Sequence, residues 1–149
     1  MILSIVLCLE YGQEYYKYPD KIVDLSTKQR TIDKIITDCF EQIVYSINQP
    51  TGARNFQAVF WNVAYYDKYY FESLFGNFFF PDGSQPDWNS LSWLQKRFMK
   101  WFNKERTRTV LTFPVETMAL LTKDGDVLDK EYGDFRLKCI PKVILSLLI

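Results

Sequence analysis

The sequence contains no histidine among its 149 residues. Without an imidazole, Ser-His-Asp and Cys-His hydrolase sites and histidine-dependent metal sites are excluded. Glycine-rich phosphate loops of the G-x-G-x-x-G and G-x-x-x-x-G-K types are missing as well. Several common enzyme classes are therefore excluded before any residue is given a role.

Cysteine and net charge are also scarce. Cys8, Cys39 and Cys139 lie far apart with no C-x-x-C pair, which predicts neither a zinc cluster nor a disulfide framework and favours a reducing, cytoplasmic compartment. Eighteen basic and 18 acidic residues cancel, so no net charge draws the surface toward nucleic acid or an anionic membrane. We expect no metal, no nucleic acid and no membrane as partners of this chain.

Apolar and aromatic residues are abundant instead. They make up 48% and 17% of the chain, enough to bury the core of about one domain. The apolar stretch 1–9 lacks the basic segment and cleavage site of a signal peptide and is too short to span a bilayer. We divide the chain into an uncertain segment 1–30, a main region 31–135, and an apolar tail 136–149 that either packs on something outside the chain or is not the natural ending.

Residues 32–47 predict an amphipathic helix, because their apolar positions recur at the i, i+3, i+4, i+7 spacing. Thr31 can cap its first turn, and Pro50 cannot continue it. Cys39 falls on the apolar stripe and is interpreted as core filler.

A second long helix is predicted from Asp87 or Ser90 onward, with one apolar face. Its opposite face and the residues after it carry a basic group, consisting of Lys96, Arg97, Lys100, Lys104, Arg106 and Arg108. This group could meet nucleotide phosphates, but the i, i+4, i+8 spacing of its lysines favours a solvated helix face.

Strands and turns separate these helices. The apolar runs 56–63 and 109–115 predict strands, and between them Asp67 can cap a shorter helix that Gly76 ends. Tight turns are predicted at 81–83 and 123–126, followed by a short helix or loop at 132–135. Helix, strand, helix, strand is the order of an α/β fold.

Several segments together carry a resemblance to a known family. They are 39–48, 54–62, 66–72, 74–78, 80–83 and 111–117. In order and spacing they resemble the helix, loop and strands of the catalytic barrel in the anaerobic, glycyl-radical class of ribonucleoside-triphosphate reductase. The resemblance extends from Asp38 to Leu121 and implies that the chain is part of a ten-stranded α/β barrel.

The resemblance also implies a chemistry. In this family a glycyl radical, installed by a radical-SAM activating enzyme, passes to a cysteine that abstracts a ribose hydrogen, and formate supplies the electrons. The family implies a homodimer that reduces ribonucleoside triphosphates, binds ATP and holds a structural zinc. No glycine here has the Arg-Val-x-Gly-Tyr context, no Cys-Cys-Arg motif occurs, and the surroundings of Cys139 do not match that motif. We therefore expect a cytoplasmic fragment that is inactive alone and carries no catalytic residue.

Candidate substrate contacts lie at two places within the resemblance, in the loop and strand around residue 57 and at the end of the second strand. They are Arg54, Asn55, Gln57, Asn62, Glu116 and Thr117. Strand ends gather the active sites of α/β barrels, and polar groups on alternate positions could face the interior. The same residues could instead form a satisfied buried hydrogen-bond network.

Two other interpretations stay open. The tyrosines around 15–18 and 65–70 could stack on bases, although packing in a core or interface explains them without a basic sheet. The whole chain could also be a small structural or interaction protein, not an enzyme, that binds a partner through exposed apolar surface.

Overall fold

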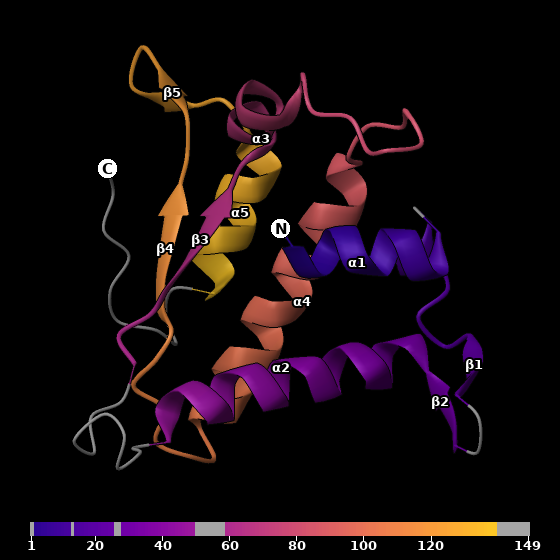
Figure 1. Cartoon of the computed structure of the whole chain (residues 1–149). Helices are drawn as coiled ribbons and strands as arrows, with labels where there is room; N and C mark the ends of the chain where they lie inside the picture. Colours follow the sequence, from indigo (N-terminus) through magenta and orange to yellow (C-terminus); the bar gives the residue numbers. More distant parts are fainter. Residues whose placement is uncertain (1, 13, 26–27, 50–58, 140–149) are drawn as a thin grey trace.

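The computed structural model describes residues 2–12, 14–25, 28–49 and 59–139 (Figure 1). Helices and strands are mixed along this chain. In order they are α1 (Ile2–Tyr11), the 3-10 turn η1 (Tyr15–Lys17), β1 (Ile22–Leu25), β2 (Lys28–Thr31), α2 (Ile32–Asn48), β3 (Asn62–Tyr66), α3 (Lys68–Phe75), α4 (Trp88–Arg106), β4 (Val115–Ala119), β5 (Thr122–Lys123), β6 (Asp126–Val127) and α5 (Lys130–Cys139). Within this part of the chain no helix is long and apolar enough to cross a membrane.

The strands pair two by two. β1 with β2 and β5 with β6 form antiparallel hairpins, whereas β3 and β4 form a parallel pair, in register from Asn62 opposite Val115 to Tyr66 opposite Ala119. Figure 1 shows β3 and β4 side by side, with α5 next to them and α4 beyond α5. The α/β class is confirmed, but the described residues form only these small sheets and do not show a ten-stranded barrel.

Both strands of the parallel pair begin later than the sequence predicts. Residues 59–61 of the predicted strand 56–63 are not in a strand, and 56–58 lie outside the described residues. The predicted strand 109–115 is loop as far as Pro114, and β4 starts at Val115, whose N–H donates to the carbonyl of Trp61 at 2.9 Å. Pro114 has no N–H to give to a ladder, so strand pairing begins only after it.

Helix α2 confirms the first predicted helix. Thr31 caps it by accepting a hydrogen bond from the backbone N–H of Lys34 at 3.2 Å. Its buried side chains are Ile32, Ile36, Phe40 and Val44. Cys39 lies beside this stripe and is only half-buried, so its expected place on the buried face is wrong. The apolar stripe follows the four-residue spacing alone and is narrower than predicted.

Helix α4 confirms the second. Asp87 caps it by accepting from the backbone N–H groups of Asn89 and Ser90 at 3.2 and 2.9 Å. Lys100 and Lys104 are exposed, as a solvated face requires. Lys96 forms an ion pair with Glu131 of α5 at 2.9 Å, so one end of this basic face lies against a neighbouring helix.

Both predicted turns are confirmed by left-handed backbone conformations. Gly83 has φ 81° in the turn that follows Phe80, and Asp124 and Gly125 have φ 54° and 88° between β5 and β6. Such conformations favour glycine and asparagine or aspartate. The short helix or loop predicted at 132–135 is part of the longer helix α5.

The buried apolar residues form two clusters. The helical cluster joins α1, η1, α2 and α4, and its members are Leu7, Cys8, Tyr15, Ile32, Ile36, Phe40, Val44, Leu94, Trp101, Phe102 and Leu111. The strand cluster lies between the parallel pair and helices α4 and α5, and its members are Tyr65, Met99, Met118, Leu120 and Tyr132. Helix α4 contributes to both clusters and connects them.

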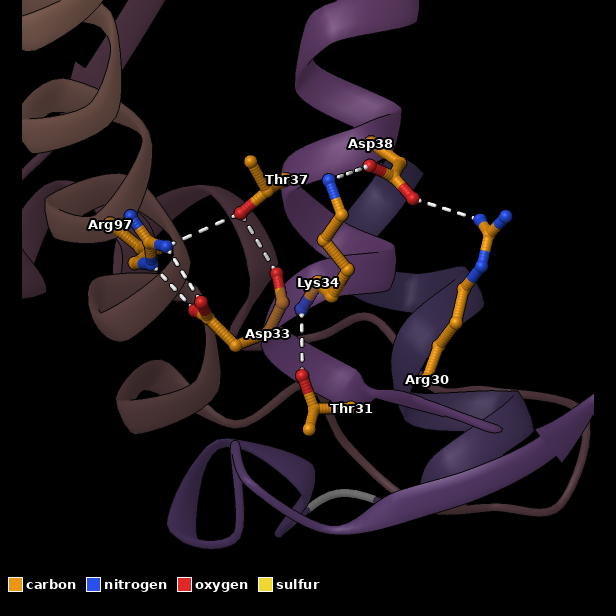
Figure 2. A network of polar contacts seen from close by, with 7 residues as sticks. All are labelled: Arg30, Thr31, Asp33, Lys34, Thr37, Asp38 and Arg97. Carbon is orange, nitrogen blue, oxygen red and sulfur yellow. Dashed lines mark hydrogen bonds and ion pairs between the residues drawn. The ribbon is translucent and has the colours of Figure 1, made fainter. Parts of the chain in front are cut away.

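A network of hydrogen bonds and ion pairs connects α2 with α4 and with β2 at the edge of the helical cluster (Figure 2). The guanidinium of Arg97 on α4 donates to both carboxylate oxygens of Asp33 on α2, at 2.7 and 2.8 Å, and to the hydroxyl of Thr37 at 3.2 Å. This hydrogen bonding from Arg97 lowers the pKa of Asp33. Asp38 binds Arg30 at 2.8 Å and Lys34 at 2.7 Å, which ties β2 to α2. Arg97, a member of the predicted basic group, therefore connects α4 to α2.

Candidate functional site

The parallel strand pair has two unlike faces. Successive side chains of a strand point to opposite sides. Tyr65 and Met118 belong to the strand cluster and so face α4 and α5. We call the other side the open face, and its residues are Asn62, Ala64, Tyr66, Val115, Thr117 and Ala119. None of them is buried, and the ring of Tyr66 stacks on Tyr70 of α3, so the described elements cover this side of the pair only in part.

Glu116 lies on the helix-covered side. Its carboxylate accepts from the hydroxyl of Tyr65 at 2.6 Å and from the guanidinium of Arg106 at 3.1 Å. Burial raises the pKa of this carboxyl, while the Tyr65 hydrogen bond and the charge of Arg106 oppose the rise. Burial and the nearby Glu116 also raise the pKa of Tyr65 well above its usual value. Glu116 was predicted either to contact substrate or to take part in a buried hydrogen-bond network. Its bonds to Tyr65 and Arg106 agree with the second alternative.

Asn62 and Thr117 lie on the open face. Asn62 is exposed and pairs with Val115 of β4. Thr117 pairs with Ala64, which is the next residue of β3 on the same face. The Thr117 hydroxyl donates to the carbonyl of Val63 at 3.3 Å and keeps acceptor capacity. Arg54, Asn55 and Gln57 lie outside the described residues. The structure thus brings two of the six predicted contacts together and sends Glu116 to the other side.

Asp67 follows the last residue of β3 and joins the carboxyl ends of both strands. Its side chain is fully buried. One oxygen accepts from the N–H of Tyr70 at 2.7 Å, and the other accepts from the N–H of Leu121, beyond β4, at 2.6 Å. The predicted helix cap is confirmed, and the bond across to Leu121 is a second role that local sequence does not reveal.

Two side-chain amides bind the backbone of the parallel pair or of the loop before it. Gln95 on α4 accepts from the N–H of Tyr66 at 2.9 Å and donates to the carbonyl of the same residue at 3.3 Å. Asn48, at the end of α2, accepts from the N–H groups of Thr112 and Phe113, both at 3.0 Å, and donates to the carbonyl of Phe113 at 2.6 Å. Sequence reasoning missed both; for Gln95 the available signal was a polar residue on an apolar helix face.

An apolar cavity of about 640 Å³ lies beside β3. Val63, Ala64, Tyr65 and Tyr66 form its strand wall. The helix walls come from Val6 of α1, Phe40 and Ile43 of α2, and Leu91, Leu94, Gln95 and Phe98 of α4, with Trp61 and Phe75 completing the lining. The cavity therefore lies between the helical cluster and the edge of β3 that faces away from β4.

The three cysteines lie apart from one another in the fold. In the part of the chain that the structure describes, no three Cys, Asp or Glu residues are grouped to hold a metal ion. Cys8 is buried with its sulfur 3.4 Å from the hydroxyl of Ser90. Burial raises the pKa of Cys39, which disfavours its thiolate. Cys139 ends α5 and packs half-buried against the strand cluster.

The family model of anaerobic ribonucleoside-triphosphate reductase matches residues 9–144. The match covers most of the chain, including the strand cluster, the parallel pair and all of the helical cluster except Leu7 and Cys8. The chain therefore belongs to the anaerobic ribonucleoside-triphosphate reductase family. A comparison with curated proteins finds no match.

Solved structures agree with this assignment. The anaerobic ribonucleotide reductase from Thermotoga maritima, crystallised with MES in its active site, is 36% identical with a TM-score of 0.70, and the match covers 74% of this chain and 18% of that one. The same enzyme with citrate in its active site is 35% identical with a TM-score of 0.66, covering 74% and 20%. Its complex with dATP and CTP is 36% identical with a TM-score of 0.67. The chain spans about a fifth of the length of that enzyme.

Proposed function

We propose that this chain is a segment of the catalytic barrel of an anaerobic ribonucleoside-triphosphate reductase. In the intact enzyme, β3 and β4 are neighbouring barrel strands with α4 and α5 on the outside. The open face then lines the interior, where a ribonucleoside triphosphate is reduced. The single observation that carries this proposal is a parallel pair with one face covered by helices and no buried residue on its other face, within a chain that belongs to the family.

The orientation of individual side chains supports this arrangement. In an α/β barrel the helices cover one face of every strand, and alternate side chains fill the interior. Asn62 and Thr117 are the polar members of the open face and are our candidates for contact with the substrate. Arg54, Asn55 and Gln57 remain candidates from the sequence. Glu116 is a positioning residue, because it holds Tyr65 and Arg106 behind the strands.

The radical chemistry belongs to parts of the enzyme that this chain lacks. Neither the glycyl radical context nor the paired-cysteine motif is present in the sequence. The glycyl radical, the activating enzyme that installs it, the structural zinc and the dimer partner are therefore assigned to the intact enzyme. The complex of the Thermotoga maritima enzyme with dATP and CTP supports nucleotides as its ligands.

The isolated chain provides the first test. We expect no deoxyribonucleotide when it is incubated anaerobically with ribonucleoside triphosphates, formate and an activating enzyme, because no radical can form on it. Deoxyribonucleotide above the blank would contradict the proposal that this chain is only a segment.

A chimeric reductase provides the second test, in which the matching segment of the Thermotoga maritima enzyme is replaced by this chain's residues 9–144. Within it, Thr117→Val and Asn62→Ala on the open face should raise KM or lower kcat about tenfold, the effect of about 1.4 kcal/mol of lost interaction. The matched control is Thr122→Val on the exposed strand β5. Equal kinetics for all three variants would exclude substrate contact by the open face.

One observation favours a different function. Several large apolar side chains are exposed, among them Phe60 at 72%, Phe79 at 58% and Val110 at 93%. Exposed apolar patches mark surfaces that bind another protein. A small interaction protein that kept part of the reductase sequence would bind a partner through exposed apolar side chains such as these, without any contribution from Asn62 or Thr117.

A further inference from the structure

The chain contains two Asp-Gly pairs, Asp82-Gly83 and Asp124-Gly125, and each lies in a tight turn. In such a pair the backbone nitrogen of the glycine can attack the side-chain carboxyl of the aspartate, because glycine has no side chain to obstruct the approach. Access does not separate the two pairs, since both are exposed and a β-carbon at either glycine would meet no atom within 4 Å. Their hydrogen bonds do separate them.

The first pair is held by hydrogen bonds at both reacting groups. The hydroxyl and the backbone N–H of Ser84 donate to one carboxylate oxygen of Asp82, at 2.7 and 2.9 Å. These two bonds lower the pKa of Asp82, which keeps the carboxyl ionised and resistant to attack. The N–H of Gly83 donates to the carbonyl of Phe80 at 2.9 Å. The nitrogen would have to give up this bond before it could react.

The second pair has none of these bonds. Among the residues that the structure describes, none binds the carboxylate of Asp124, and the N–H of Gly125 has no acceptor. The pair forms the turn of the β5–β6 hairpin, whose strands are two residues long. Figure 1 shows this turn projecting beyond the end of β4. Both reacting groups are therefore unbound in a turn that little else holds.

The backbone of this turn also lies one rotation away from the geometry of attack. Asp124 has φ 54° and Gly125 has φ 88°, the combination of a type I′ turn. The related type II′ turn keeps the positive φ at the first position and turns the peptide plane between the two residues, which sets ψ of Asp124 to about −120°. Glycine adopts the accompanying negative φ freely. That ψ places the Gly125 nitrogen beside Cγ of Asp124, as closure of a five-membered ring requires.

We propose that Asp124 is a site of spontaneous isomerisation to isoaspartate and that Asp82 is protected from it. The nitrogen of Gly125 loses its proton and bonds to Cγ of Asp124, and one carboxyl oxygen leaves Cγ in a water molecule. A second water molecule then opens the resulting succinimide. When this water breaks the bond from the nitrogen to the main-chain carbonyl carbon, Gly125 stays attached through Cγ, and the main-chain carbonyl carbon becomes a free carboxylate. The atomic composition is unchanged, and the turn gains one backbone atom.

The change is confined to the hairpin. The N–H of Leu128 donates to the carbonyl of Leu121 at 3.0 Å, and the N–H of Leu121 donates to Asp67 at 2.6 Å, so both bonds lie between the hairpin and the strand pair. The new carboxylate is a methyl acceptor for enzymes that esterify isoaspartyl groups with S-adenosylmethionine. The inference is independent of the proposed function, because it needs only the geometry of the turn.

Methyl labelling of the aged protein provides the test. The full chain is kept folded at neutral pH for weeks, then denatured, cut after glutamate, and treated with an isoaspartyl methyltransferase and labelled S-adenosylmethionine. The peptide 117–131 contains Asp124-Gly125, and the peptide 73–105 contains Asp82-Gly83. We expect 117–131 to take up at least about tenfold more label, the effect of about one hydrogen bond on a reaction barrier.

Two variants and an unfolded sample supply the controls. Asp124→Glu should remove the label from 117–131, because a glutamate would have to close a larger ring, whereas Asp126→Glu in the same peptide should leave the label unchanged. In guanidinium chloride both peptides should take up label alike, since the bonds that hold Asp82 and Gly83 are lost. Equal label in the two peptides of the folded chain, no label in 117–131, or label that survives Asp124→Glu would each overturn the proposal. A difference that persists in guanidinium chloride would overturn it as well, because the neighbouring sequence and not the turn would then be its cause.

Discussion

The helical cluster and the parallel strand pair are built by different means. Around the helical cluster, α2 and α4 each have a capped start, an apolar face against the other and a bidentate ion pair at the rim. The strand pair has one face with no buried residue and one edge without a described partner strand. The side chains of Asp67, Gln95 and Asn48 bind its backbone and the loops at its ends. The helical region is therefore held by contacts between its own helices, whereas the strand pair has an edge that no described strand binds.

The largest expected difference lies between two capping aspartates. Asp67→Ala should cost about 3 kcal/mol of unfolding free energy, because it leaves two partly buried backbone N–H groups without partners and empties a fully buried position. Asp87→Ala, at the half-buried cap of α4, should cost about 1 kcal/mol. Urea unfolding of both variants measures the difference. Equal losses in the two variants would show that the bond from Leu121 to Asp67 adds nothing to the stability that a helix cap gives.

The next effect concerns the edge of β3. Gln95→Met keeps the side-chain volume but removes both bonds to Tyr66, and should cost about 2 kcal/mol. It should also speed hydrogen exchange at the Tyr66 amide more than elsewhere in the sheet. Lys100→Met on the exposed side of the same helix is the control and should change neither quantity. A Tyr66 amide that stays protected in Gln95→Met would mean that the amide does not stand in for a strand.

A smaller effect is expected in the helical region. Arg97→Lys keeps the charge beside Asp33 but cannot form the two parallel hydrogen bonds. We expect a loss of about 1 kcal/mol, because the pair is partly exposed to solvent. Arg108→Lys, at a side chain 68% exposed, should cost nothing measurable. If Arg97→Lys costs more than Gln95→Met, the helical region depends on its polar rim more than on its apolar core.

The smallest effect is a difference in pH dependence. The Asp33 pKa is lowered from 3.8, so its contribution to stability is present above that value and is lost as pH falls through the lowered pKa. The Glu116 pKa is raised from 4.5, so its contribution is full below that value and is lost as pH rises through the raised pKa.

Urea unfolding between about pH 3 and pH 7 separates the two groups. Asp33→Asn should reduce the loss of unfolding free energy at acid pH. Glu116→Gln should reduce the change of unfolding free energy with pH above pH 4.5. Identical pH profiles for the two variants would show that the two regions do not differ in how they hold their carboxyl groups.

Helix starts were predictable from the sequence because a cap acts over three residues. Thr31, Asp67 and Asp87 each bind N–H groups two or three positions ahead, and all three were found from residue type and the pattern that follows. The turns at Gly83 and Gly125 were predictable for the same reason, since the glycine itself permits the conformation.

The strand pair was less predictable because distant contacts decide it. Asn48 binds the backbone of Thr112 and Phe113 from far along the chain, in the stretch that the sequence favours as a strand. The sides taken by Glu116 and Thr117 depend on register, and a shift of one residue exchanges them. Resemblance to the family predicted that strands occur in these segments. Only the register of β3 with β4 shows which face each side chain lies on.

The central claim is that residues 9–144 form a working part of a reductase barrel, and turnover by the chimeric reductase tests it most directly. The chimera is activated anaerobically, its glycyl radical is confirmed by electron paramagnetic resonance, and deoxyribonucleotide formed from ribonucleoside triphosphate and formate is measured. We predict turnover within about a hundredfold of the parent enzyme, a difference of about 2.7 kcal/mol in the barrier. A folded chimera that carries the radical and forms no deoxyribonucleotide would contradict the claim.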